Sequence, residues 1–286
     1  MKTTLFKRIG MWSMLVFFFS PLSAQPQDEL LLPYLFHDSV AAKTTVSNNI
    51  PAIIPLQSGI RKYVNDYLNE NAETLEIIKE RNSAKLKTIQ KILVKRGIPA
   101  GLMYLAIVES ELSNSATSRV GAAGIWQLMP ETARTLGLLV NGKTDQRRHT
   151  YQSSVAAADY LKALYKQFDD WLLVVAAYNC GAGNVYKAIK LSGSREFWKL
   201  QRFLPAETRN HVKHFIATHF YYEANGSVVT LTKKERIQYL ASLIEVVTKE
   251  EGNTAADSPA FCNQPVNTLL VAQHVCELRL EIGKEK

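Results

Sequence analysis

Apolar side chains recur at helical spacing through most of the middle of the chain. The first such run starts in the segment GIRKYVNDYLNE at residues 59–70, and its apolar positions continue through Leu75, Ile78, Leu86, Ile89 and Leu93. Gly97 and Pro99 then supply a stop signal, because glycine favours the end of a helix and proline cannot continue one. We therefore predict helical structure that ends just before Gly97.

A second predicted helix begins at Pro99, in the segment PAGLMYLAIVESEL. Residues 102–108 are apolar on every side, so this helix should be buried on most of its faces. It leads directly into a carboxylate, Glu109, which continues the apolar stripe one turn after Leu105. Glu111, two residues later, points to a different side and toward water. The pattern thus favours a buried acid at the end of a buried helix.

Helical spacing returns further along the chain. Residues 157–168 predict an amphipathic helix, residues 205–225 predict another, and Thr232 with Glu235 forms a predicted capping box for a third. The apolar segment WLLVVAAYN at residues 171–179 fits either a helix or a strand. Because no series of alternating strand patterns appears, the fold class predicted from the sequence is mainly α.

These patterns divide the chain into four parts. Residues 57–226 form the predicted helical domain. Residues 25–56 are typical of an extended N-terminal segment, because prolines interrupt any helix there. Residues 227–286 hold a C-terminal helix and a tail to which the sequence assigns no role. Residues 1–24 have the layout of a secretory signal peptide, with basic residues, an apolar centre and a small residue, Ala24, at the end. We predict cleavage after Ala24 and an exported protein, with a retained anchor helix as the alternative.

The charge excludes some kinds of partner. The whole chain has a net charge of +8, and residues 1–24 carry three basic and no acidic side chains, so the mature chain keeps a net charge of +5. This mild excess suits an anionic polymer. No long Lys and Arg run with interleaved aromatic residues marks a nucleic-acid site, so we predict no nucleic-acid partner.

The three cysteines are expected to behave differently. Cys262 and Cys276 lie close together near the C-terminus and could close a small loop as a disulfide in an exported protein. Cys180 has no local partner, and we interpret it as a small buried apolar residue that stays reduced.

The acid has unusual neighbours. Burial disfavours an ionised carboxylate, and a carboxylic acid that keeps its proton near neutral pH can act as a general acid. Small or polar residues follow it, at Ser110, Ser118, Gly121, Ala122, Ala123 and Gly124. Such residues let a polymer chain approach the backbone closely, and Gln127 offers both an amide and a carbonyl group. Among nearby aromatic residues, Tyr178 and Tyr186 are candidates for lining a sugar groove, and core packing is preferred for Trp126. The alternative for Glu109 is an acid that turns to solvent or pairs with Lys or Arg.

The motifs VES, SRVGAAGIWQLMPETA, TDQRRH, AAYNCGAGNV and PAETRNHV occur in this order. Together they resemble the soluble lytic transglycosylase (SLT) catalytic domain, and are most similar to the membrane-bound lytic transglycosylase D group of bacterial cell-wall enzymes. The resemblance runs from about residue 60 to 225. It implies a lysozyme-like, goose-type fold with N-terminal helices, a periplasmic location and peptidoglycan glycan strands as the partner. Protein partners in wall synthesis or division are not identified by it.

The resemblance also assigns roles to residues. Glu109 matches the single catalytic acid. Seven residues match positions that border the acid or contact the glycan, namely Ser118, Gly121, Gly124, Gln127, Tyr178, Asn179 and Glu207. Three positions depart from the family pattern: Cys180 replaces a small residue, Asn114 replaces a frequent proline, and His211 replaces a frequent tyrosine.

The implied reaction cleaves the β-1,4 bond between N-acetylmuramic acid and N-acetylglucosamine and leaves a 1,6-anhydro end. It needs no cofactor and no metal. A hydrolytic lysozyme would need a positioned water and usually a second carboxylate, for which Asp145, Asp159 and Glu207 are available. A non-catalytic glycan-binding protein is the other alternative. The Gly-x-Gly turn after residue 179 is a weak nucleotide-binding signal, and His211 with His214 is a weak metal signal because no third ligand is evident.

Overall fold

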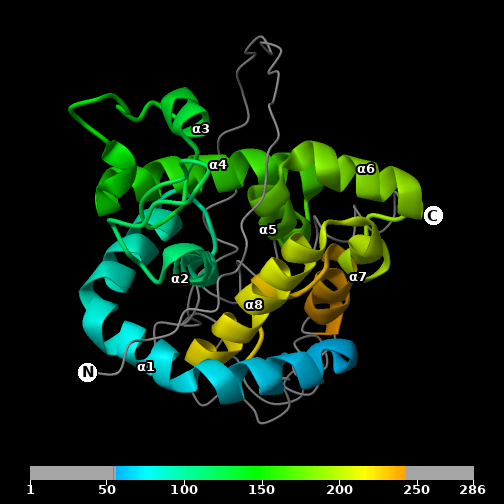
Figure 1. Ribbon diagram of the computed structural model, residues 1–286. Coiled ribbons are helices and arrows are strands. Elements are labelled where there is room, and N and C mark those ends of the chain that lie inside the picture. Colours follow the sequence, from blue (N-terminus) through cyan, green and yellow to red (C-terminus); the bar gives the residue numbers. More distant parts are fainter. Residues whose placement is uncertain (1–53, 55, 243–286) are drawn as a thin grey trace, which may run out of the picture. The chain divides into compact units, whose positions relative to one another are not determined.

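The computed structural model describes residue 54 and residues 56–242, and Figure 1 shows the arrangement of its helices. The chain begins with α1 (Ser58–Lys95), in which Asn82 has non-helical backbone angles and produces a kink. The predicted stop is confirmed, because α1 ends before Gly97. Gly97 has a φ of 71°, the left-handed conformation that commonly follows a helix C-terminus.

The predicted second helix is also confirmed, although its first turn is tighter than a regular α-helix. It starts as η2 (Ala100–Met103), a 3₁₀ turn, and continues as α2 (Tyr104–Ser110). Residues 102–107 are buried, as their apolar character predicts. Glu109 therefore lies in the last turn of a helix that the core surrounds.

A long non-helical connection follows α2. Three isolated β-bridges are the extent of β structure in the described part of the chain: Thr117 with Ala123, Ala123 with Leu128, and Val140 with Asp145. The next helical elements in order are α3 (Pro130–Thr135), η3 (Gln146–Arg148) and α4 (Thr150–Phe168). The mainly α class predicted from the sequence is confirmed.

The ambiguous apolar segment is a helix, α5 (Trp171–Cys180). Asp170 caps it by accepting hydrogen bonds from the backbone N–H groups of Leu172 at 2.9 Å and Leu173 at 3.1 Å. Residues 171–177 are all buried, because α4 and α8 pack around the helix. A helix buried on all sides has no polar face, so its sequence lacks the period that would have identified it.

The rest of the described chain adds shorter helices around α8. They are α6 (Ala182–Ser192), α7 (Phe197–Leu200), η4 (Gln201–Phe203), α8 (Ala206–Glu223) and η5 (Val228–Thr230). A last helix starts at residue 233 and continues to residue 242. The capping box at its start is confirmed, since Thr232 N–H donates to Glu235 at 2.8 Å and Glu235 N–H donates to Thr232 Oγ1 at 3.2 Å.

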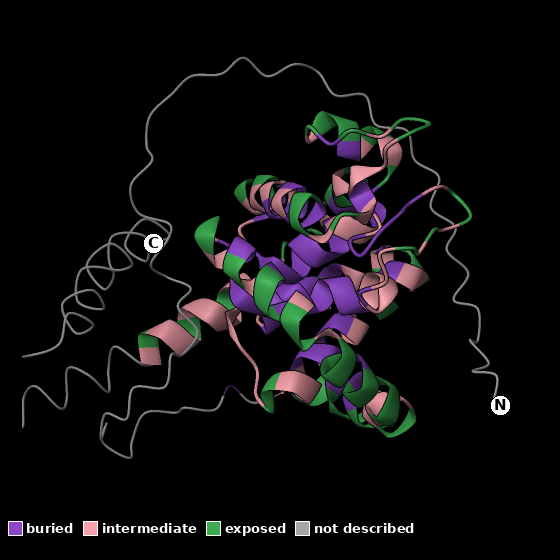
Figure 2. Cartoon of the chain, turned by 90° about the vertical axis from the view of Figure 1, so that its left-hand side faces the viewer, coloured by how far each residue is buried: buried purple, intermediate pink, exposed green. Residues whose placement is uncertain are grey.

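Packing around α8 brings the parts of the site together. This helix contacts α1, α2 and α5, which come from three different regions of the sequence. Figure 2 shows the buried residues concentrated toward the interior of the described part of the chain. None of the helices in the described residues is both long and apolar enough to cross a membrane. The predicted signal peptide at residues 1–24 and the tail after residue 242 lie outside the described residues.

Candidate active site

Glu109 is the buried acid that the apolar pattern predicts. Its side chain is only 8% exposed. No hydrogen bond from a described side chain reaches its carboxyl group. The nearest basic group is His211 of α8, whose Nε2 lies 3.3 Å from Oε1 of Glu109 with a side chain 10% exposed. This contact is short enough for an ion pair, yet Nε2 of His211 makes no hydrogen bond, because the two groups are not aligned for one.

The backbone after Glu109 turns sharply, which ends α2 directly behind the acid. Glu111 and Leu112 both have positive φ angles, of 55° and 63°. The turn is held because the Leu112 side chain is buried and Lys85 donates to its carbonyl oxygen at 2.6 Å. Glu111 is half-buried and not turned fully to water as the sequence suggested, and burial raises the pKa of its carboxyl group. The carboxyl group of Glu111 therefore has a different environment from that of Glu109, although only two residues separate them.

The small-residue segment 118–128 folds into a compact loop beside the end of α2. Ser118 closes it, because its Oγ accepts a hydrogen bond from Ala122 N–H at 2.9 Å. Ser110 of α2 donates to the carbonyl oxygen of Ile125 at 2.9 Å, which ties the loop to the helix that carries Glu109. Gly121 has a φ of 86° and open space where a Cβ would lie. The sequence prediction that this segment lies next to the acid agrees with this geometry.

Gln127 is less available than the sequence suggested. It has a positive φ of 46°, and its side-chain amide donates to the carbonyl oxygen of Gly124 at 2.8 Å. Its NH₂ group therefore stabilises the loop. The carbonyl oxygen of the same side chain makes no hydrogen bond within the described part of the chain.

Two arginines that the sequence analysis left without a role hold this loop in place. Arg147 is buried and forms a two-pronged pair with Asp145, at 2.9 Å and 2.8 Å. The same guanidinium donates to the carbonyl oxygens of Gly121 at 2.7 Å and Leu128 at 3.0 Å. Since an arginine supplies several donors in a rigid plane, one side chain fixes both ends of the loop.

Arg148 does the same for the connection between α2 and the loop. Its guanidinium donates to the carbonyl oxygen of Ser115 at 2.8 Å and to the hydroxyl of Thr117 at 2.7 Å. In return, the Asn114 side chain donates to the carbonyl oxygen of Arg148 at 2.7 Å. Asn114, one of the three residues that depart from the family pattern, thus has a structural partner. The sequence signal for these contacts was the motif TDQRRH, in which an acid is followed closely by two arginines.

Tyr178 and Asn179 approach the site from the end of α5. The Tyr178 hydroxyl donates to the carbonyl oxygen of Trp126 at 2.7 Å, not to Glu109. Burial raises the pKa of Tyr178 well above its usual value, and the nearby charge of Glu109 contributes in the same direction. Asn179 accepts a hydrogen bond from Thr208 of α8 at 2.7 Å. Both polar groups therefore connect α5 to the surrounding elements.

The other aromatic residues and Glu207 take different positions. Trp126 is fully buried and its indole donates to Ser154 at 2.9 Å, which confirms the preference for core packing. Tyr186 is exposed and packs against Phe168, with the ring centres 5.0 Å apart. Glu207 is half-buried in the first turn of α8, one turn before His211.

Two of the acids considered as a second catalytic carboxylate are occupied by arginines. Asp145 is held by Arg147, and this hydrogen bond is the main reason that the pKa of its carboxyl group is lowered. Asp159 receives two hydrogen bonds from Arg96, at 2.6 Å and 2.8 Å, on the exposed side of α4. Neither acid contacts Glu109. The geometry consequently offers no paired carboxylate from these two positions.

Cys180 is buried at the end of α5 and is a free thiol, as the sequence indicated. Burial raises the pKa of this thiol to about 11, so it remains protonated at neutral pH. Cys262 and Cys276 lie outside the described residues, and their pairing stays a prediction that mass spectrometry of the non-reduced protein can test.

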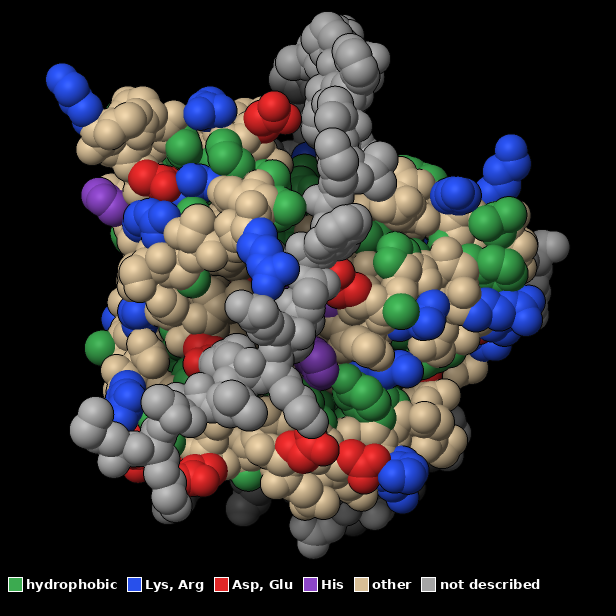
Figure 3. Space-filling view, viewed as in Figure 1, with side chains coloured by type: hydrophobic (Ala, Val, Ile, Leu, Met, Phe, Trp, Pro, Cys, Tyr) green, Lys and Arg blue, Asp and Glu red, His purple; other side chains and the backbone are tan. Residues whose placement is uncertain are grey.

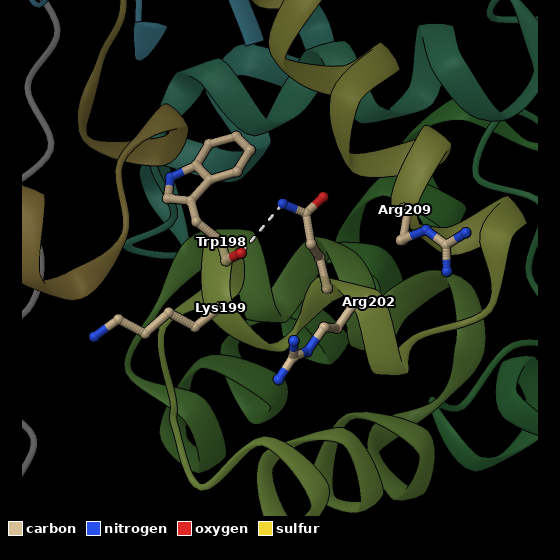
Figure 4. A pocket seen from close by; sticks show the side chains of 5 residues that line it. Trp198, Lys199, Arg202 and Arg209 are labelled. Carbon is tan, nitrogen blue, oxygen red and sulfur yellow. Dashed lines mark hydrogen bonds between the residues drawn. The ribbon is translucent and has the colours of Figure 1, made fainter. Parts of the chain in front are cut away.

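A separate basic pocket of about 390 Å³ lies where α7 and η4 meet the start of α8. Figure 3 shows Lys and Arg side chains gathered over the part of the surface where Figure 1 places α6 and α7. Figure 4 shows Lys199, Arg202 and Arg209 around the pocket, next to Trp198. These cations already have protein contacts: Lys199 with Glu196, Arg202 with the Phe203 ring and Arg209 with the Leu204 carbonyl oxygen. Glu109 does not line this pocket.

Comparison with known families assigns the region that contains this site. Residues 87–201 match the family model described as the transglycosylase SLT domain. Residues 87–201 are therefore similar to an SLT domain. The resemblance predicted from the motifs is confirmed, and the matched residues include Glu109, the loop 118–128, and Tyr178 with Asn179. His211 and Glu207 lie just beyond the matched residues.

A curated relative extends the SLT match. Over 169 residues the chain is 41% identical to membrane-bound lytic murein transglycosylase D of Escherichia coli strain K12. The aligned region covers 57% of this chain and 37% of the relative. The same values hold for that protein in Escherichia coli O6:H1. The chain therefore matches little more than a third of the length of these relatives.

Two solved structures resemble parts of the chain. An inactive mutant of the lytic transglycosylase Slt from Pseudomonas aeruginosa has a TM-score of 0.44 and 26% identity, over 51% of this chain and 26% of its own. The 70 kDa soluble lytic transglycosylase of Escherichia coli has a TM-score of 0.47 and 23% identity, over 62% of this chain and 31% of its own. With TM-scores below 0.5, these likenesses add nothing to the assignment, which depends on the SLT match and the relative.

Proposed function

We propose that this protein is a peptidoglycan lytic transglycosylase, which cleaves the β-1,4 bond between N-acetylmuramic acid and N-acetylglucosamine and leaves a 1,6-anhydro end. One observation carries the proposal: the buried carboxyl group of Glu109 stands at the end of α2, within the residues that match the SLT domain and beside a loop of small residues. A reaction that uses one carboxyl group twice fits this arrangement better than one that needs two.

In the proposed reaction, Glu109 first acts as a general acid. Its proton passes to the glycosidic oxygen, and the bond from that oxygen to C1 of the muramic residue breaks. The acetamido group of the same sugar stabilises the positive charge that develops at C1, in the role that a second enzyme carboxylate has in many glycosidases. The N-acetylglucosamine side leaves with a new hydroxyl group.

Glu109 is then ionised and acts as a general base. It removes the proton of the C6 hydroxyl, whose oxygen attacks C1 and closes the 1,6-anhydro ring. No water is consumed, and Glu109 ends the cycle with a proton on its carboxyl group. Among the described residues, no side chain donates a hydrogen bond to the oxygens of this carboxyl group.

The positions of two of the other acids, Asp145 and Asp159, support this choice over hydrolysis. A hydrolytic lysozyme usually has a second carboxylate across the scissile bond. Asp145 is bound by the buried Arg147, and Asp159 is bound by Arg96 on an exposed surface. Both carboxylates are thereby committed to structural pairs.

The loop 118–128 and the end of α5 are the proposed glycan-contacting region. Gly121 leaves open space where any other residue would have a side chain, and Gln127 keeps its side-chain carbonyl oxygen free of partners among the described residues. Tyr178 and Asn179 already bond to Trp126 and Thr208, so we assign them to holding the loop and α8 around the glycan. Ser118, Gly124 and Glu207 complete the proposed set.

The same proposal places the protein in the cell envelope of a bacterium. Residues 1–24 are predicted to direct export, and the periplasm is where glycan strands of peptidoglycan are accessible. The net charge of the mature chain, +5, suits a polymer that carries carboxylates.

Product analysis tests the proposal. Purified peptidoglycan is digested with the mature protein, and the released fragments are identified by mass spectrometry. We expect fragments that end in 1,6-anhydro-N-acetylmuramic acid. Fragments 18 Da heavier, with a reducing end, would assign hydrolysis instead. Binding to peptidoglycan without any cleavage would make the protein a glycan-binding module.

A further inference from the structure

His211 approaches the acid from α8 and has an unused hydrogen-bonding atom. Its Nε2 is buried, lies 3.3 Å from Oε1 of Glu109, and makes no hydrogen bond. A buried polar atom without a partner costs free energy, commonly about 1–3 kcal/mol. Such an atom at the centre of a site indicates a partner that is present in only one state of the reaction.

The ionised form of Glu109 is that partner. In the proposed reaction Glu109 is neutral before the glycosidic bond breaks and carries a negative charge between the two proton transfers. A small movement would bring an Nε2–H group into line with the carboxylate, and hydrogen bonds to a charged acceptor are the stronger kind. Interactions that form as charge develops accelerate a reaction, whereas those already present in the ground state do not.

Two neighbours of this pair, His214 and Tyr178, are uncharged at neutral pH. His214 lies one turn further along α8 and packs against Tyr67, with ring centres 5.0 Å apart. Burial lowers the pKa of His214 to about 4, and the neighbouring His211 acts in the same direction. Tyr178, which is buried near Glu109, is neutral and donates to the carbonyl oxygen of Trp126. Among the described residues, His211 is therefore the basic side chain that reaches Glu109.

We propose that His211 is a positioning residue for the reaction: from a proton on Nε2, it donates a hydrogen bond to Glu109 once that acid has given up its proton. This inference rests on the proposed function, since it assigns a step to a second residue of the same site. It also gives the departure from the family pattern at this position a role, because both histidine and tyrosine can donate a hydrogen bond from a ring.

Two substitutions separate a hydrogen-bonding role from a packing role. His211→Phe keeps a ring and removes the donor, and His211→Gln keeps an N–H group near the position of Nε2. We expect His211→Phe to lower kcat for glycan cleavage roughly 10²-fold, the effect of losing one positioned donor to a developing charge, with little change in KM. We expect His211→Gln to recover most of this loss. His214→Phe, on the same helix, serves as the matched control and should stay close to wild type.

Unfolding curves for the four proteins correct the rates for the folded fraction. Equal losses in His211→Phe and His211→Gln, or wild-type kcat in His211→Phe, would overturn the proposal. These comparisons use total bond cleavage, so they hold whether the product is an anhydro or a reducing end.

A measurement without turnover tests His211 independently of the proposed function. Nitrogen-15 chemical shifts of the histidine rings reveal which nitrogen carries the proton in the resting protein. We expect the Nε2–H form for His211, with an Nε2 shift that responds to Glu109→Gln. A proton on Nδ1, with a bare Nε2 that accepts the proton of Glu109, would contradict the proposal even if the wild-type protein cleaves peptidoglycan.

Discussion

The backbone carbonyl oxygen of Arg147 stands where a Cβ atom on Gly124 would have to lie. Gly124 also has a φ of 76°, a conformation that other residues adopt only at a cost. The loop beside Glu109 and the segment that carries Arg147 therefore approach each other as closely as two backbones can. The glycine that the sequence assigned to glycan contact is required first for folding.

This relationship predicts a large difference between two glycines of one loop. Gly124→Ala should lower the free energy of unfolding by roughly 3–4 kcal/mol, because steric overlap and backbone strain add. Gly121 has a φ of 86° but open space around it. Gly121→Ala should therefore lower the free energy of unfolding by only about 1–2 kcal/mol. Urea denaturation of the two variants measures both values. Equal losses would mean that the approach of Arg147 to Gly124 is not as close as described.

The catalytic assignment predicts opposite results for two neighbouring acids. Glu109→Gln should lower glycan cleavage roughly 10³-fold or more, because an amide can neither give nor take the proton. Glu111→Gln should leave cleavage close to wild type, since this half-buried residue follows the end of α2, where its φ of 55° turns the chain. Rates are compared after circular dichroism has shown that both variants are folded. If Glu111→Gln lost activity and Glu109→Gln kept it, Glu109 would not be the catalytic acid.

The burial of Glu109 could be predicted because it depends on local information. An apolar helix with an acid in line with its buried face indicates the position of that acid without any knowledge of the rest of the chain. The helix ends at Gly97 and at Thr232 with Glu235 were predictable for the same reason. In each case the residues that decide the structure are within about one turn of each other.

Contacts between distant segments could not be predicted in this way. His211 meets Glu109 only because α8 packs against α2, and no periodicity in either helix specifies that pairing. The carbonyl oxygens that Arg147 binds belong to residues 19 and 26 positions earlier. α5 gave no clear signal because it is apolar on every side. The direction of Glu111 was misjudged because two residues after Glu109 with positive φ turn the chain.

Buried histidines predict a loss of stability in acid. His219 of α8 is fully buried, and burial lowers its pKa from 6.5 to about 4. Between these two pH values the unfolded chain binds a proton that the folded protein excludes, so stability falls as the pH drops through this window. By linkage, the change from pH 7 to 4.5 should be about 2.5 kcal/mol for this one residue. His214, whose pKa is lowered by burial as well, acts in the same direction.

Urea denaturation at pH 7, 5.5 and 4.5 checks this expectation. His219→Gln keeps a polar side chain near Ser227, whose Oγ lies 2.8 Å from Nε2 of His219, but does not titrate. This variant should lose less stability than wild type on acidification. Parallel stability curves for the two proteins would show that His219 does not exclude a proton in the folded state.

Tyr178→Phe tests whether the Tyr178 hydroxyl supports the loop beside Glu109 or whether the ring only fills the core. The hydroxyl donates to the carbonyl oxygen of Trp126 at 2.7 Å, so its removal leaves a buried acceptor unpaired and should cost about 1–2 kcal/mol of stability. We also expect turnover to fall about tenfold or more, because Trp126 belongs to the loop beside Glu109 and small displacements of such groups slow catalysis strongly. Tyr160→Phe is the matched control: its ring packs against Tyr178, with centres 5.4 Å apart, and its hydroxyl makes no hydrogen bond within the described residues. Kinetics on peptidoglycan and thermal unfolding of both variants provide the two measurements. Unchanged turnover per folded Tyr178→Phe molecule would restrict this hydroxyl to a structural role.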